Sequence, residues 1–195
     1  MAHRITTVRL SNRIGVVVTI LTLIAAAILA FQVAPAQAQE HPPLPSPVAE
    51  MAPGIHPLGK GSHKLFGFKV YDASLWVVHV KWNPDEPHAL DVRVLRPIPA
   101  DTLINVGVDE MARLSDADSA KRAAWHSELA KVVPNLKNGD RLIALSAPNH
   151  DTYFYLNGKQ TGEIDDPSFG RAFFGIWLDP RTNNPSLRKS LLNNK

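Results

Sequence analysis

Residues 65–80, LFGFKVYDASLWVVHV, are dense in aromatic and β-branched side chains. This composition favours a β-strand. The apolar positions have one parity before Asp72 and the other parity after it. Because successive side chains of a strand point to opposite faces, the switch predicts a bulge or sharp bend near Asp72, or a strand that is covered on both faces.

Alternating strand patterns and helical patterns follow this stretch. The elements that we expect are strand 89–95, helix 102–114, a second helix ended by Pro134, strands 141–146, 152–156 and 160–164, and two helices that start at Pro167 and Pro185. Asp101 is expected to cap the first helix, and Ser115 with Asp118 forms a capping-box pattern before the second. Asn157-Gly158 predicts a tight hairpin, since both residues tolerate a positive φ. Tight turns between strands and grouped helices indicate an α+β fold, an antiparallel sheet with helices on one face.

The N-terminal residues have the pattern of a secretory signal peptide. Three arginines lie in residues 1–13, an apolar run covers residues 14–31, and Ala36-Gln37-Ala38 matches a small-residue cleavage site. The sequence therefore predicts a signal peptide over residues 1–38 with cleavage after Ala38, and a periplasmic or secreted protein. The alternative is an inner-membrane anchor formed by residues 14–31, which are just long enough to span a bilayer.

Residues 39–58 are rich in proline and are expected to form an extended, polyproline-like linker. A proline-rich ligand for a partner domain is the alternative function of this segment. The folded domain is expected over residues 59–195.

Charge and composition exclude several classes of function. The 195 residues carry a net charge of +3, but outside residues 1–38 the 18 basic side chains equal the 18 acidic ones. A basic surface for nucleic acid is therefore not expected. The chain has no cysteine, which excludes disulfides, thiol nucleophiles and cysteine-ligated metal sites.

Motifs for catalysis and cofactors are also missing from the sequence. The eight histidines show no metal-ligand spacing, so no metal is expected, and no glycine motif for a dinucleotide cofactor opens a helix. Sequence neighbours on a strand point to opposite faces, so Ser62 and His63 cannot easily form a nucleophile–base pair. Asp165-Asp166 is explained by helix capping. Lys64 and Lys69 are expected to keep their charges in water, although one of them could pair with an anionic ligand.

Several segments together resemble the bacterial chalcone isomerase-like family. They are GKGSHKLFGFKVYDASLW at residues 59–76, Val94-Leu95-Arg96, FFGIWL at residues 173–178, PSLR at residues 185–188, and Leu191-Leu192. The resemblance implies an open-faced β-sandwich, a large antiparallel sheet with a helical layer. In the plant enzymes of this family an arginine just after the G-x-G segment stabilises the enolate formed during chalcone closure. In the fatty-acid-binding relatives, an arginine and a tyrosine hold a carboxylate.

This chain has His63 at the position of the family's arginine, and Tyr71 at the position of a threonine of the plant enzymes. The resemblance therefore implies a cleft for a small apolar or fatty-acid-like molecule rather than true chalcone isomerase activity. We expect His63, Lys69 and Tyr71 to be polar anchors and Phe173 and Trp177 to be wall or core.

Two other functions stay open. The chain could be an isomerase, or intramolecular lyase, that acts on an enone with His63 or Tyr71 as proton donor or polarising group. It could also be a protein-interaction module whose cleft is filled by side chains. No cofactor and no nucleic-acid partner are expected, and membrane contact is expected only through the N-terminal signal or anchor. The sequence leaves the oligomeric state open.

Overall fold

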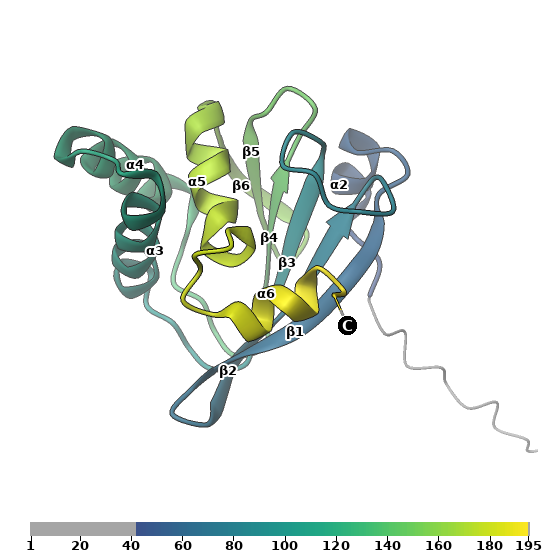
Figure 1. The fold of residues 1–195 in the computed structure, drawn as a ribbon, viewed down its shortest axis with the longest axis horizontal. Coiled ribbons are helices and arrows are strands. Elements are labelled where there is room, and N and C mark those ends of the chain that lie inside the picture. Colours follow the sequence, from purple (N-terminus) through teal and green to yellow (C-terminus); the bar gives the residue numbers. More distant parts are fainter. Residues whose placement is uncertain (1–41, 195) are drawn as a thin grey trace, which may run out of the picture. The chain divides into compact units, whose positions relative to one another are not determined.

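Six strands lie in one sheet in the same order as in the chain, and every neighbouring pair is antiparallel. The computed structural model describes residues 42–194 (Figure 1). The strands are β1 (His56–Leu65), β2 (Phe68–Val77), β3 (His88–Val94), β4 (Arg141–Ser146), β5 (Thr152–Leu156) and β6 (Lys159–Ile164). Neighbouring strands are therefore joined by short connections, except that β3 and β4 are joined through two helices.

Four helices cover one face of this sheet (Figure 1). The helices α3 (Ala100–Ser115) and α4 (Ser119–Val132) connect β3 to β4, while α5 (Pro167–Leu178) and α6 (Pro185–Leu191) follow β6. The predicted α+β fold, an antiparallel sheet with a layer of helices on one face, is confirmed. None of the helices in residues 42–194 is long and apolar enough to span a bilayer.

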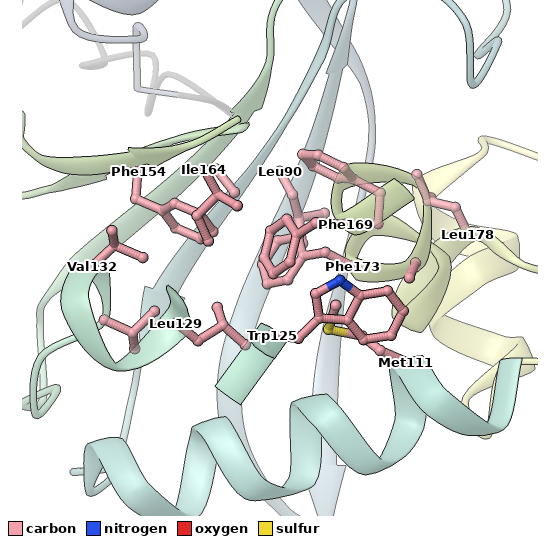
Figure 2. Packing of buried hydrophobic residues seen from close by; sticks show 14 of the residues in the cluster. Leu90, Met111, Trp125, Leu129, Val132, Phe154, Ile164, Phe169, Phe173 and Leu178 are labelled. Carbon is pink, nitrogen blue, oxygen red and sulfur yellow. The ribbon is translucent and has the colours of Figure 1, made fainter. Parts of the chain in front are cut away.

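An aromatic core fills the space between the sheet and these helices (Figure 2). Phe169 and Phe173, one turn apart on α5, stack with ring centroids 5.5 Å apart, and Phe154 of β5 meets both rings edge to face. Trp125 of α4 packs edge-on against Phe169. Edge-to-face and offset contacts of this kind are favourable between aromatic rings, so they hold α5 against β5 and α4.

The opposite face of the sheet is covered by a segment that was predicted to be an extended linker. Residues 46–51 instead form a short helix, α2 (Ser46–Met51), and the first strand begins already at His56. Val48 and Ala52 are fully buried and belong to one apolar cluster with Trp76 and Tyr155. The prolines around α2 are compatible with this helix, because a proline in the first turn gives up no helical hydrogen bond.

Arg141 holds the start of this segment against the sheet. Its guanidinium forms a two-pronged ion pair with Asp91, at 2.9 and 2.7 Å, and donates to the carbonyl oxygens of Pro43 and Pro42 at 2.9 and 3.1 Å. A planar guanidinium with several fixed donors is suited to bridge a carboxylate and two carbonyls at once.

The strand expected over residues 65–80 begins instead at Phe68, after a hairpin turn. Phe66 and Gly67 have φ angles of 49° and 81° and form the tight turn of a hairpin between β1 and β2. Tyr71 pairs with His63 while Lys69 pairs with Lys64. Val70 therefore forms a bulge, two residues before the predicted position at Asp72.

Two helix caps also differ from expectation. Pro99 precedes α3, so Asp101 lies in the first turn rather than at the cap. Asp118 alone caps α4 by accepting from the backbone N–H of Lys121, while the Ser115 hydroxyl donates to the carbonyl of Met111 in α3.

The other predicted turn and helix starts are confirmed. Asn157 and Gly158 have φ angles of 50° and 85° in the β5–β6 turn, and Asp166 and Asn184 cap α5 and α6. The predicted signal peptide, its cleavage site after Ala38 and the alternative anchor at residues 14–31 lie outside the described residues.

Candidate functional site

A small apolar cavity lies between the sheet and the helices. Its volume is about 60 Å³, and its walls come from β2, β3, β4, α3, α4, α5 and the segments that flank α3 and α4. No charged side chain is among the described residues that line it. The polar groups of its wall are the Tyr71 hydroxyl and the Trp177 indole nitrogen. An apolar space with very few polar groups is the usual form of a site for an apolar small molecule.

Tyr71 and Trp177 meet at the edge of this cavity. The Trp177 Nε1 donates a hydrogen bond to the Tyr71 Oη at 2.9 Å, and both residues line the cavity. Burial raises the pKa of Tyr71 to about 12. The phenol is therefore neutral at physiological pH, and its own proton remains available to a ligand that carries an oxygen acceptor.

His63 lies behind Tyr71, not in the cavity wall. Their rings stack with centroids 4.9 Å apart and an interplanar angle of 17°. Asn184 Nδ2 lies 2.9 Å from His63 Nδ1, and Asn184 Oδ1 accepts from the backbone N–H of Leu187 as the cap of α6. Since the amide oxygen is used by the cap, the amide nitrogen must donate to His63 Nδ1, and the imidazole proton must be on Nε2.

This arrangement keeps His63 uncharged. Partial burial lowers the pKa of the imidazole, and a proton on Nδ1 would face the Asn184 amide donor. The position at which the resemblance places an arginine is therefore occupied by a neutral ring. That ring stacks on Tyr71 and is not part of the cavity wall.

The structure does not bring Lys69 to the cavity. The bulge at Val70 places Lys69 and Tyr71 on opposite faces of β2, because their partners Lys64 and His63 are consecutive residues of β1. The Lys69 ammonium lies 3.5 Å from Asp72 and its side chain is 54% exposed. Of the five predicted ligand-contacting residues, those in the cavity wall are Tyr71, Phe173 and Trp177.

The G-x-G segment has a packing role in this chain. A Cβ atom on Gly59 would lie 2.3 Å from the carbonyl oxygen of Ser190 and 2.5 Å from that of Leu191, and one on Gly61 would lie 2.7 Å from Leu187 Cδ1. Both glycines therefore let α6 lie directly on β1. This contact carries Asn184 to His63, and sequence reasoning missed it because a helix cap and a strand residue 121 positions apart share no local signal.

A larger and more open groove of about 1010 Å³ runs along α5, from its first turn to the loop that follows it, and past the loop after β2. Charged side chains of its wall form the ion pairs Lys121–Asp166, Arg171–Asp85 and Arg181–Asp179, and the Arg188 guanidinium donates to the carbonyl of Leu178. Ion pairs that are exposed or half-exposed, as these are, are typical of a solvated protein surface. In residues 42–194, no group of three or more His, Asp or Glu side chains could hold a metal ion.

Comparisons with known proteins agree with the fold. A family model described as chalcone isomerase-like matches residues 58–193. An uncharacterized protein of Haemophilus influenzae is 27% identical over 146 residues, which are 72% of this chain and 70% of that protein. Among solved structures, a fatty-acid-binding protein of Arabidopsis thaliana superposes with a TM-score of 0.58 at 11% identity, over 73% of this chain and 89% of that one. At such low identity the likeness concerns the fold.

Proposed function

Because the chain belongs to the chalcone isomerase-like family, we propose that it binds a small apolar molecule in the cavity beside Tyr71. The observation that carries the proposal is the lining itself, an apolar space with one phenol whose proton is free for a ligand. The Arabidopsis neighbour, described as a fatty-acid-binding protein, supports a ligand with an apolar tail.

The ligand must displace side chains to enter. A volume of about 60 Å³ holds about two water molecules, whereas sites for small molecules are typically about 300–1,000 Å³. Leu103, Ile176 and Trp177 are among the wall side chains that are only partly buried. We expect these side chains to move when a ligand enters.

The polar end of the ligand is proposed to be a neutral oxygen acceptor, such as an ester, a ketone or a protonated acid. A carboxylate in an apolar site needs a cation or several donors. Neutral His63 behind Tyr71, and a lining without charge in the described residues, offer neither. This refines the expectation of a fatty-acid-like ligand.

The test is calorimetric titration with methyl decanoate and with decanoate at pH 8. We expect the ester to bind more tightly than the carboxylate, and Tyr71→Phe to weaken ester binding about three- to tenfold, the range of one lost hydrogen bond. Tyr153→Phe is the matched control, since that tyrosine packs with the cluster on the opposite face of the sheet.

Gly107→Leu should abolish binding by filling the cavity. Equal affinity for both probes would contradict the neutral anchor, and no binding of either would favour an interaction module with a filled cleft.

We also propose that the protein does not close chalcones. Enolate stabilisation needs a strong donor or a permanent charge at the developing oxyanion, and the described cavity wall contains no arginine. An enzyme that acts on another enone would use Tyr71 to polarise the carbonyl. The expected result is no cyclisation of 2′-hydroxychalcone above the buffer rate, and turnover that depends on Tyr71 would favour the enzyme instead.

Export remains part of the proposal. The basic start, apolar run and Ala36-Gln37-Ala38 exit support cleavage after Ala38 and delivery to the periplasm or medium. N-terminal sequencing of the mature protein should begin at Gln39. A full-length chain in the membrane fraction would instead support the anchor at residues 14–31.

A further inference from the structure

The tip of the β1–β2 hairpin carries an unusual set of exposed apolar side chains. Leu65, Phe66 and Phe68 are 54%, 90% and 61% exposed. The hairpin that carries these residues extends beyond the other strands of the sheet (Figure 1). Single exposed apolar residues are common, but three around one two-residue turn form a local apolar patch.

The turn geometry does not require a phenylalanine. Phe66 has a φ of 49°, a left-handed conformation that is costly for a bulky residue. The β5–β6 hairpin of the same chain makes a turn of similar φ with Asn157 and Gly158, the residues that suit it best. A strained and fully exposed aromatic ring suggests a role for the side chain outside the fold.

Three cations surround this apolar tip. Lys64 and Lys69 face each other across the two strands just behind the turn, and the Arg96 guanidinium lies 4.9 Å from the centroid of the Phe68 ring. Asp72 lies 3.5 Å from the Lys69 ammonium. The apolar side chains lie at the turn, and the basic side chains lie next to them, farther from the turn. This arrangement matches an anionic bilayer surface, in which the hydrocarbon lies beneath the layer of phosphates.

We propose that this tip inserts Leu65, Phe66 and Phe68 into the interface of a bilayer containing anionic lipids, with Lys64, Lys69 and Arg96 at the headgroups. A narrow, convex tip buries too little area for a stable protein interface, which needs about 800 Å² on each side. It is well shaped to enter between lipid headgroups. This contact is separate from the predicted N-terminal signal or anchor and does not depend on what the cavity binds.

The absence of cysteine from the chain allows a site-specific test with the full-length protein. An environment-sensitive fluorophore is attached to the Phe66→Cys variant and, as control, to Val80→Cys, a position that is 85% exposed in the loop after β2. With vesicles of phosphatidylcholine and phosphatidylglycerol, we expect a blue shift at position 66 and none at position 80. No shift at position 66, or equal shifts at both, would overturn the proposal.

Two further variants separate insertion from folding. Phe66→Asn gives this turn the Asn-Gly sequence of the other hairpin, so we expect equal or higher thermal stability and at least about tenfold weaker vesicle binding by the tip, measured with the fluorophore on Phe68→Cys. Lys64→Gln and Lys69→Gln should each weaken binding to anionic vesicles about fivefold. Unchanged binding in all of these variants, or a fluorophore response only to another protein, would contradict a membrane contact.

Discussion

The indole nitrogen of Trp177 donates to the phenol oxygen of Tyr71 across 2.9 Å and so joins α5 to β2 at the rim of the cavity. Tyr71→Phe removes the acceptor and leaves the indole N–H without a partner in a largely apolar setting. We expect a loss of about 1–2 kcal/mol in the free energy of unfolding, measured with urea. In a double-mutant cycle with Trp177→Phe, additive effects would show that the two side chains do not interact in solution.

Alkaline pH should destabilise the fold through Tyr71. Its pKa is about 12 in the folded state against an ordinary value of 10.0. Because the folded pKa is raised, this stabilisation is complete below pH 10 and is lost as the pH rises from 10 toward 12. The expected slope is about 1.4 kcal/mol per pH unit in that range.

The ionisation of the tyrosine phenols can be followed by absorbance at 295 nm during a pH titration. The ionisation with the highest pKa should be absent in the Tyr71→Phe variant. Urea unfolding at pH 9 and pH 11 gives the matching change in stability. A wild-type titration in which no phenol ionises above pH 11 would contradict the buried environment described for Tyr71.

Gly59→Ala should destabilise the protein through the contact of β1 with α6. The new Cβ would overlap backbone carbonyls of Ser190 and Leu191, which cannot move as a flexible side chain could. Overpacking of this kind costs about 1–3 kcal/mol. Gly107→Ala is the matched control, since its Cβ would lie 3.9 Å from Ile176 Cδ1 in ordinary contact. It should stabilise α3 by up to about 1 kcal/mol, and a Gly59→Ala variant as stable as this control would show that α6 does not lie on β1.

Arg141→Lys should release the segment that covers the second face of the sheet. Lysine keeps the positive charge beside Asp91 but cannot also reach the carbonyls of Pro42 and Pro43. We expect faster amide hydrogen exchange at Val48 and Ala52, with little change in the amides of β4. Exchange rates that do not change would mean that the apolar contacts of α2 hold this segment without the guanidinium.

Much of the fold could be predicted because its boundaries use strong local signals. The Asn157-Gly158 turn and the caps Asp166 and Asn184 are specified by residues that prefer those conformations almost regardless of surroundings. The strand β1 was missed because its sequence, HPLGKGSHKL, contains a proline and two glycines, which have low strand propensity, and the two glycines lie where α6 approaches. α2 was missed because proline-rich composition outweighed the few apolar residues that it buries.

The candidate site was predictable only in part, for similar reasons. Phe173 and Trp177 carry a helical pattern, and Tyr71 was selected on the resemblance to the family. On a regular strand Lys69 and Tyr71, two residues apart, would share one face, and the bulge at Val70 puts them on opposite faces. The contact of Asn184 with His63 is purely tertiary, so no spacing in the chain could reveal it.

The packing of α6 on β1 has a consequence for biosynthesis. Each strand can pair with its predecessor as the polypeptide emerges, since the sheet follows chain order. The contact of Gly59 in β1 with Ser190 and Leu191 must nevertheless wait until α6, which follows all six strands in the chain, has been translated. A nascent chain that ends before α6 therefore carries an assembled sheet on which the face of β1 at Gly59 is uncovered, and the docking of α6 covers that face.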